Sequence, residues 1–271
     1  MPAPIRFLHL TDLHISDPAV PDPELSTDTL AALDEAIARI AAMDPAPAFV
    51  VISGDLTNRG DAESYRLLAG RLSRIAVPVF LAMGNHDDRA AFHAELLGQP
   101  GNARYAHDGL AGGAHVIVLD SQQPGRIGGR LEEDQFAFLE AALARHPDVP
   151  KIVVCHHPPA HSAEEELIWH SLDWESTARL GAALQGRAEG LLCGHVHVPR
   201  VSHWHGLPVV VGNGLHNLID PMVLDGMRIM ETVGFTLCTL RPSGLTAEFV
   251  TFPHRDRELA HLPMEVVRSF V

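Results

Sequence analysis

The sequence is almost without lysine. Lys151 is the only lysine among 271 residues, and the formal net charge is −14. A general nucleic-acid-binding protein needs a basic stripe to neutralise phosphates, so the composition argues against this class of protein. An anionic substrate stays possible, because bound divalent cations can invert the local electric field.

Long apolar runs and paired cysteines are also missing. No run approaches the roughly 20 apolar residues that span a bilayer, and the start MPAPIRFLHL does not have the pattern of a secretory signal. The three cysteines, Cys155, Cys193 and Cys238, lie in apolar, strand-like segments. This pattern favours buried thiols in a reducing compartment, and we therefore expect a cytoplasmic protein.

The apolar content of 46% is enough for a substantial core. Strands are predicted at 5–10, 48–53, 78–83, 114–120 and 151–155. Helices are predicted at 26–43, with Ser26 or Thr27 as N-cap, and at 61–75, 88–97, 132–146 and about 171–187. This alternation predicts an α/β fold with a mostly parallel sheet, and the short strands after residue 190 predict either a second, more antiparallel sheet or an edge. We expect one domain over 1–271, with a strand-rich part at 205–271.

Potential metal ligands follow five of the predicted strands. They are Asp12 with His14, Asp55, Asn85 with His86, His156 with His157, and His195 with His197. The carboxyl ends of strands form the ligand crevice of open α/β sheets, so we expect these side chains to converge.

Each motif alone also has a purely structural interpretation. The stretch MGNHDDRA could be a turn in which Asp87 or Asp88 caps the next helix. In GHVH, two histidines two residues apart in an extended segment would point to one face. Five such motifs together favour a metal site of two Asp, one Asn and four His, a set that suits Mn, Fe, Zn or Co. Asp55 could then bridge two ions about 3.5–4 Å apart.

In their order along the chain, Asp12-x-His14, Gly54-Asp55, Gly84-Asn85-His86-Asp87, His156 and Gly194-His195-x-His197 resemble the signature of the calcineurin-like metallophosphoesterase superfamily. The strings GNHDDR and HHPP resemble its bacterial class III cyclic-nucleotide phosphodiesterase and glycerophosphodiesterase branch. The resemblance covers about residues 5 to 198. It implies a four-layer α/β/β/α sandwich with two facing mixed β-sheets.

The resemblance also implies which residues bind two metals. One metal would be held by Asp12, His14, Asp55 and His197, and the other by Asp55, Asn85, His156 and His195. A metal-bridging hydroxide would attack phosphorus, and His86 would bind the phosphoryl group or protonate the leaving oxygen. Many relatives have an Asp paired with that histidine where this chain has Asn58, so we expect the Asn58 amide to orient His86 and to make it a weaker acid.

Several alternatives stay open. The enzyme could hydrolyse small phosphodiesters such as cyclic nucleotides or glycerophosphodiesters. It could instead be a phosphomonoesterase or a nucleotide pyrophosphohydrolase, or the chain could be a non-catalytic metal-binding scaffold. His161, Asn213 and His216 are candidate pocket residues. The segment 215–235, with Met222, Met227 and Met230, could fill a core or form a lid or the surface of a homodimer.

Overall fold

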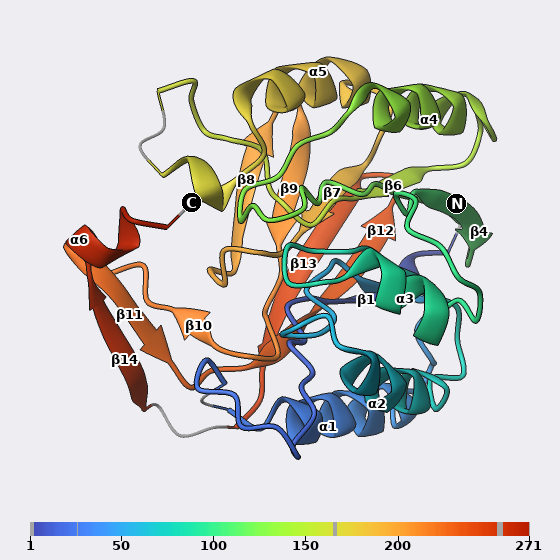
Figure 1. Cartoon of the computed structure of the whole chain (residues 1–271). Helices are drawn as coiled ribbons and strands as arrows, with labels where there is room; N and C mark the ends of the chain where they lie inside the picture. The colour runs from blue at the N-terminus through green and yellow to red at the C-terminus, as the bar shows by residue number, and fades with distance from the viewer. Residues whose placement is uncertain (1–2, 26, 165–166, 254–256, 271) are drawn as a thin grey trace.

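The computed structural model describes residues 3–25, 27–164, 167–253 and 257–270. Two β-sheets face each other at the centre, and helices cover the outer face of each (Figure 1). The α/β/β/α sandwich predicted from the sequence is therefore confirmed. None of the described helices is long and apolar enough to cross a membrane.

The first sheet has the order β13-β12-β1-β2-β3. Its strands are β1 (Ile5–Leu10), β2 (Val50–Ile52), β3 (Val79–Leu81), β12 (Gly234–Arg241) and β13 (Gly244–Thr251). The first three are parallel to one another, while β12 pairs antiparallel with β1 and β13 pairs antiparallel with β12. The helices α1 (Thr29–Ala41), α2 (Ala62–Leu72) and α3 (Arg89–Glu95) accompany this sheet.

The N-cap of α1 differs from the prediction. The Asp28 carboxylate accepts a hydrogen bond from the Ala31 backbone N–H at 2.9 Å, so Asp28 caps the helix in place of Thr27. Ser26, the other predicted cap, lies outside the described residues. Asp88 caps α3 in the same way, as one of the two alternatives for MGNHDDRA had it.

The second sheet has the order β4-β5-β6-β7-β9-β8. Its strands are β4 (His107–Ala111), β5 (Ala114–Val118), β6 (Lys151–Val154), β7 (Gly190–Cys193), β8 (Arg200–Trp204) and β9 (Leu207–Val211). The helices α4 (Glu133–Ala144) and α5 (Trp174–Leu184) cover it, and the short helix η1 (Ile168–His170) precedes α5. The edge strand β4 was not predicted, because only the last two residues of its sequence HDGLA are apolar and the strand is only partly buried.

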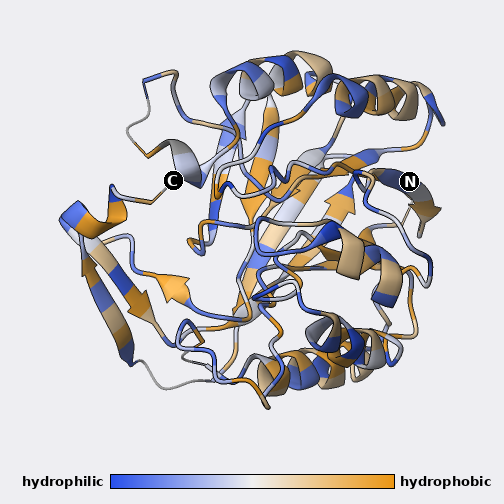
Figure 2. Ribbon diagram, viewed as in Figure 1, coloured by the Kyte–Doolittle hydropathy of each residue, from blue (hydrophilic) through white to orange (hydrophobic). Residues whose placement is uncertain are grey.

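Apolar residues fill three layers. Alternate residues of a central strand enter different cores, so that Leu8 and Leu10 pack under the helices of the first sheet while Phe7 packs between the sheets. Cys155 belongs to the core beneath the helices of the second sheet. Figure 2 shows the resulting pattern, with hydrophobic strands inside and hydrophilic residues on the outer helices. All three cysteines are free and buried, as predicted.

A third, three-stranded sheet was not predicted. It consists of β10 (Leu218–Ile219), β11 (Gly226–Met230) and β14 (Glu258–Pro263), followed by α6 (Met264–Val267), and it lies beside the sandwich (Figure 1). The turn between β10 and β11 exposes Met222 and Leu224 to 82% and 85%. Met222 therefore does not fill a core.

Candidate metal centre

The predicted ligands meet because two sets of parallel strands end at one edge of the sandwich. In the first sheet, β1, β2 and β3 lie side by side and parallel. In the second sheet, β6, β7 and β9 do the same. The loops after these strands bring Asp12, His14, Asp55 and Asn85 from the first sheet against histidines from the second. The site is thus built between the two sheets.

One group of ligand atoms surrounds the end of β1. The Nε2 atoms of His14 and His197 lie 3.3 Å apart. His14 Nε2 is 3.6 Å from Asp55 Oδ2, and His197 Nε2 is 3.3 Å from Asp12 Oδ1. These three contacts place imidazole nitrogens beside nitrogen or carboxylate oxygen atoms, and such a donor set matches the ligand chemistry of a transition-metal ion.

A second group shares Asp55. His156 Nε2 lies 3.3 Å from Asp55 Oδ2 and 3.3 Å from Asn85 Oδ1. The His195 ring lies next to the His156 ring, with centroids 5.1 Å apart. Asp55 is 2% exposed, and its Oδ2 atom contacts a histidine of each group, His14 and His156. Its position fits a ligand that bridges two ions.

Hydrogen bonds to oxygen acceptors fix which nitrogen each histidine presents. The Nδ1 atoms of His14 and His197 donate to Asn58 Oδ1 (2.8 Å) and Asn217 Oδ1 (2.6 Å). His156 Nδ1 donates to the carbonyl of Ser53 at 2.8 Å. In each of these rings Nε2 is therefore the nitrogen that can bind a metal. A histidine that binds a metal through one ring nitrogen typically donates a hydrogen bond from the other to an oxygen atom.

His195 is arranged in the opposite sense. Its Nε2 donates to the carbonyl of Trp169 at 2.8 Å, which leaves Nδ1 as the metal-binding nitrogen. Its backbone N–H donates to both carboxylate oxygens of Asp12, at 3.0 and 3.2 Å. His195 thus holds one predicted ligand with its backbone and offers its ring to the site.

The backbone at the site is strained. Seven described residues other than glycine have a positive φ, and five of them are predicted ligands: Asp12, His14, Asp55, His195 and His197. Residues with a side chain rarely adopt this conformation, and its cost must be offset by the surrounding structure. Strain concentrated on five ligands indicates that the fold is built to aim these side chains.

This strain corrects one sequence prediction. GHVH was expected to be an extended segment, but β7 ends at Cys193 and His195 and Val196 form a bend. With φ of 74° and 50°, the two histidines turn toward the site while Val196 is buried in the core under the helices. Both imidazoles face the site, as the sequence predicted, but a bend rather than an extended segment places them there.

Glycine is required where the loops approach one another. A Cβ atom on Gly84 would lie 2.2 Å from Asp55 Oδ1 and 2.7 Å from His156 Nε2. A Cβ atom on Gly194 would lie 1.9 Å from Thr11 Oγ1. The glycines of GNH and GH therefore make room for the ligands of the neighbouring strands.

The electrostatics of the cluster favour bound positive charge. Burial opposes protonation of His156, yet the adjacent Asp55 carboxylate outweighs it and raises the pKa of His156 to about 9. Burial likewise disfavours the charged form of Asp12, but the facing His197 holds the pKa of Asp12 well below its usual range. Burial lowers the pKa of His195 to about 3, which keeps that ring neutral and able to bind a metal.

His86 lies beside the ligands, and its partner differs from the one expected. His86 Nδ1 donates to the backbone carbonyl of Asn58 at 2.9 Å, whereas the Asn58 amide accepts from His14 and donates to Asp22 Oδ2 at 2.8 Å. The backbone N–H of His86 donates to Asp55 Oδ1 at 2.9 Å. The Asn58 side chain is thus hydrogen-bonded to His14, a predicted ligand, whereas His86 is hydrogen-bonded to the Asn58 backbone.

Three other candidate residues, His157, His161 and Asn213, are less well placed to act in the site. His157 has both ring nitrogens hydrogen-bonded, to Ser121 Oγ (2.7 Å) and the Ile127 carbonyl (2.8 Å), so His156 is the better placed of the pair. His161 is exposed in a loop. Asn213 is buried and donates to the Val250 carbonyl.

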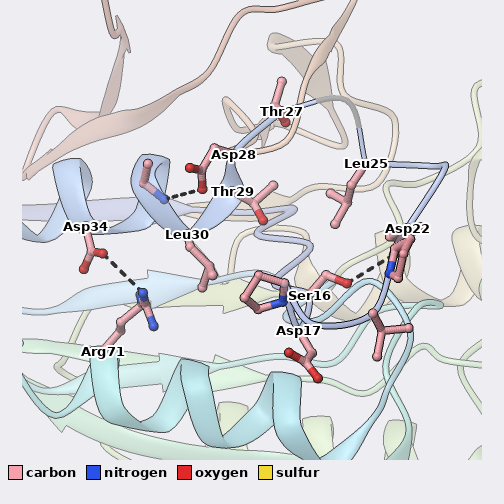
Figure 3. Close-up of a pocket in the computed structure, with 14 residues that line it drawn as sticks. Ser16, Asp17, Asp22, Leu25, Thr27, Asp28, Thr29, Leu30, Asp34 and Arg71 are labelled. Atoms are coloured by element: carbon pink, nitrogen blue, oxygen red, sulfur yellow. Dashed lines mark hydrogen bonds and ion pairs between the residues drawn. The ribbon is translucent and has the colours of Figure 1, made fainter.

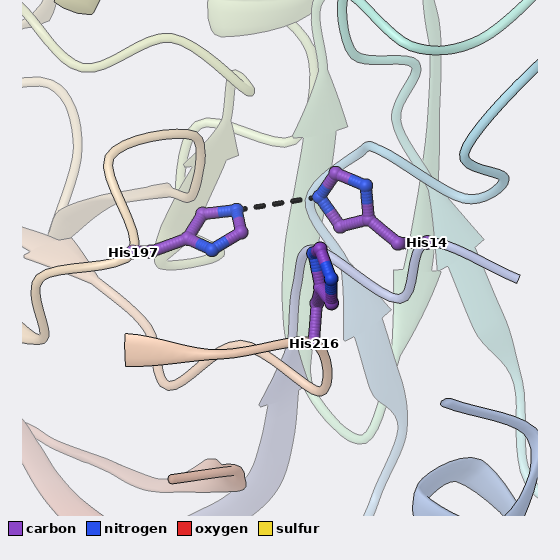
Figure 4. Close-up of side chains that lie close together, drawn as sticks. All are labelled: His14, His197 and His216. Atoms are coloured by element: carbon purple, nitrogen blue, oxygen red, sulfur yellow. Dashed lines mark hydrogen bonds between the residues drawn. The ribbon is translucent and has the colours of Figure 1, made fainter. Parts of the chain in front are cut away.

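Only His216, among the candidate pocket residues, joins the cluster. Its ring centroid is 4.6 Å from that of His14 and 5.8 Å from that of His197 (Figure 4). Its Nε2 is buried with no hydrogen-bond partner among the described residues. Asn217, the partner of His197, was missed, although it follows β9 and the strand-end pattern could have indicated it.

A cleft of about 210 Å³ opens over the ligands. Its polar floor includes His14, Asp55, Asn85, His86 and His195. Its apolar part comprises Ile127, Trp169, Ile219, Met227, Ile229 and Phe270. None of the described residues that line the cleft is an arginine or a lysine. Any positive charge that faces an anionic substrate in the cleft must therefore come from bound cations or protonated histidines.

A larger pocket of about 510 Å³ lies between the loop at 16–28 and α1 (Figure 3). Asp17, Asp22 and Asp28 line it, and Arg71 pairs with Asp34 at 3.3 Å. None of the predicted metal ligands is among its lining residues. Its size therefore does not mark the reactive site.

Known proteins resemble both the sequence and the fold. The family model for calcineurin-like phosphoesterases matches residues 5–199. A probable cyclic nucleotide phosphodiesterase of Rhodococcus erythropolis is 33% identical over 225 residues, which cover 78% of this chain and 71% of that protein. Glycerophosphodiester phosphodiesterase GpdQ of Enterobacter lignolyticus is 32% identical over 173 residues, 60% of each chain. The crystal structure of a dimetal phosphatase from Danio rerio matches 91% of this chain and 98% of its own, with a TM-score of 0.66 and 14% identity.

Proposed function

The chain belongs to the calcineurin-like phosphoesterase family, and from this premise we propose that it hydrolyses small phosphodiesters in a reaction that depends on two metal ions. The relatives named as cyclic nucleotide and glycerophosphodiester phosphodiesterases support a phosphoric diester hydrolase. The observation that carries the proposal is Asp55, which contacts the histidines of both ligand groups.

The ligand sets we propose are those expected from the sequence. One metal would take Asp12, His14, Asp55 and His197, and the other Asp55, Asn85, His156 and His195. Bound there, two cations of the Mn, Fe, Zn or Co type would supply an activated water and neutralise charge on the phosphoryl oxygens. The protein's part is to orient the ligands and to fix which nitrogen each histidine presents, through the four histidine hydrogen bonds to oxygen described above.

His86 has the second role in the proposal. Its Nδ1–H is committed to the Asn58 carbonyl, so its other nitrogen, Nε2, is left to face the substrate. There it would bind the phosphoryl group or give a proton to the leaving oxygen. The absence of arginine and lysine from the described lining favours a singly charged diester over a doubly charged monoester.

The test is a hydrolysis screen with metal-depleted and metal-loaded protein. We expect Mn, Fe, Zn or Co to restore hydrolysis of bis(p-nitrophenyl) phosphate, with much weaker activity on p-nitrophenyl phosphate. Asp55→Ala should abolish activity and lower metal occupancy, because it removes the bridge. His86→Ala should keep its metals and lose turnover, most for poor leaving groups. A metal-replete protein inert to both esters would show a scaffold instead.

Two further expectations belong to the same proposal. A cytoplasmic location is supported by three buried, free cysteines. A homodimer formed through the part at 205–271 is supported by Met222 and Leu224, which are exposed on the turn between β10 and β11. A mass of 29.4 kDa in light scattering, that of the monomer, would rule the dimer out.

A further inference from the structure

We propose that the apolar part of the cleft is a subsite for a flat aromatic arm of the diester, and that Trp169 and Phe270 determine this preference. The inference rests on the proposed function, since it concerns which phosphodiesters the same site accepts. The apolar wall, as we call it, consists of Ile127, Trp169, Ile219, Met227, Ile229 and Phe270.

The aromatic side of the apolar wall is held in position by the metal centre. Trp169 and Phe270 form an edge-to-face pair with ring centroids 5.5 Å apart and an interplanar angle of 63°. The Trp169 carbonyl accepts from His195 Nε2 at 2.8 Å. The aromatic pair therefore lies at a defined place relative to a proposed metal ligand.

The aliphatic side comes from the third sheet. Met227 and Ile229 are two residues apart on β11 and point to the same face, and Ile219 pairs with Ile229 across β10. The backbone N–H of Ile219 donates to the carbonyl of His197 at 2.9 Å. This side is thus also fixed to a proposed ligand, so the two apolar surfaces flank the ligand cluster.

The composition of the apolar wall discriminates between the two substrate arms that the relatives suggest. An aromatic ring would leave water and pack on Trp169 and Phe270. A glycerol-type arm would bring hydroxyl groups against carbon, where these six side chains offer a single polar group, the Trp169 indole N–H. Burying hydroxyl groups without partners is costly. The geometry therefore favours an aromatic or heteroaromatic arm over a polyol.

The test uses two singly charged phosphonate monoesters, in which a P–C bond that hydrolysis does not break joins the arm to phosphorus. One is methyl benzylphosphonate and the other is methyl 2,3-dihydroxypropylphosphonate, and each inhibits the hydrolysis of bis(p-nitrophenyl) phosphate by the metal-loaded protein. We expect the benzyl compound to have an inhibition constant at least about tenfold lower. Equal constants would overturn the proposal.

Variants assign the preference to the aromatic pair. Trp169→Ala and Phe270→Ala should each raise the inhibition constant of the benzyl compound about tenfold. The inhibition constant of the dihydroxypropyl compound should stay unchanged. Leu224→Ala, which removes an exposed side chain on the β10–β11 turn, should change neither constant. An unchanged benzyl preference in both aromatic variants would also refute the inference.

Two controls separate this proposal from the others. Removal of residues 270 and 271 leaves every described strand intact, so it tests Phe270 even if Trp169→Ala fails to fold. Metal content by elemental analysis shows whether each variant keeps its ions. If the wild-type protein shows no metal-dependent diester hydrolysis, the proposed function is refuted. If it hydrolyses diesters but the benzyl and dihydroxypropyl compounds inhibit equally, only the apolar subsite is refuted.

Discussion

Replacing Asn58 by alanine separates two roles for this residue. If the amide orients His86, as the family pattern implies, the variant should lose acid catalysis. The structure instead places the amide against His14, with Asn58 Oδ1 accepting from His14 Nδ1 at 2.8 Å, while His86 uses the backbone carbonyl. Alanine keeps that carbonyl. Asn58→Ala should therefore weaken metal binding and leave the orientation and catalytic role of His86 unchanged.

The size of the effect follows from the contact that is lost. Removing the outer partner of a metal-bound histidine typically costs 10–100-fold in metal affinity, which is about 1.4–2.7 kcal/mol. Asn58 is 4% exposed, so water cannot readily replace its oxygen. Only one of the two metals should be affected, because His14 belongs to one ligand set.

Isothermal titration of metal-depleted protein with Mn²⁺ measures this loss directly. We expect two binding events in the wild type and, in Asn58→Ala, one of them weakened 10–100-fold. At saturating metal, the dependence of kcat on leaving-group pKa should match that of the wild type. Asn102→Ala, in an exposed loop, is the control and should behave as the wild type does.

One result would refute this reasoning. If both metals bind Asn58→Ala normally and kcat falls more steeply for poor leaving groups, the amide acts on His86 after all. The hydrogen bond between His14 and Asn58 would then have no functional weight.

Three other substitutions test residues that support the site or the folded structure. Gly84→Ala should lower metal content at least about tenfold in a folded protein, measured by elemental analysis, because its Cβ would lie 2.2 Å from Asp55 Oδ1. Asp87→Asn should lower the free energy of unfolding in urea by about 1–3 kcal/mol, since the Asp87 carboxylate accepts from three backbone N–H groups; an unchanged urea midpoint would contradict this. Burial lowers the pKa of His107 to about 4, so the unfolded chain binds more protons as pH falls from 6.5 and stability drops by up to about 3 kcal/mol at pH 4. His107→Phe should show a smaller drop in urea unfolding between pH 7 and pH 4.

The ligands could be predicted because they follow strands with strong apolar patterns. The predicted strand at 5–10 coincides with β1, and the carboxyl-end rule then brings Asp12 and His14 into one crevice. This inference needs no knowledge of loop conformation. It fails where conformation matters, as in GHVH, because no local signal predicts positive φ at two histidines.

The rest of the cleft depends on contacts between distant segments. Trp169 lies in the short helix η1, far along the chain from any predicted strand, and its carbonyl is held by a hydrogen bond from His195. The third sheet has short strands, of which β10 has only two residues, and its pairing of β11 with β14 joins segments about 30 residues apart. Patterns within one short window cannot indicate such pairings.

Each proposed metal takes ligands from both sheets, and this has a consequence for the architecture as a whole. An ion bound to Asp12 and His197 would join chain segments 185 residues apart, and none of the described strands belongs to both of the sheets that it would link. It would act as a reversible cross-link, closing a long loop much as a disulfide does but under the control of metal supply. Metal availability would then set how firmly the two halves of the molecule hold together, as well as whether the site can react.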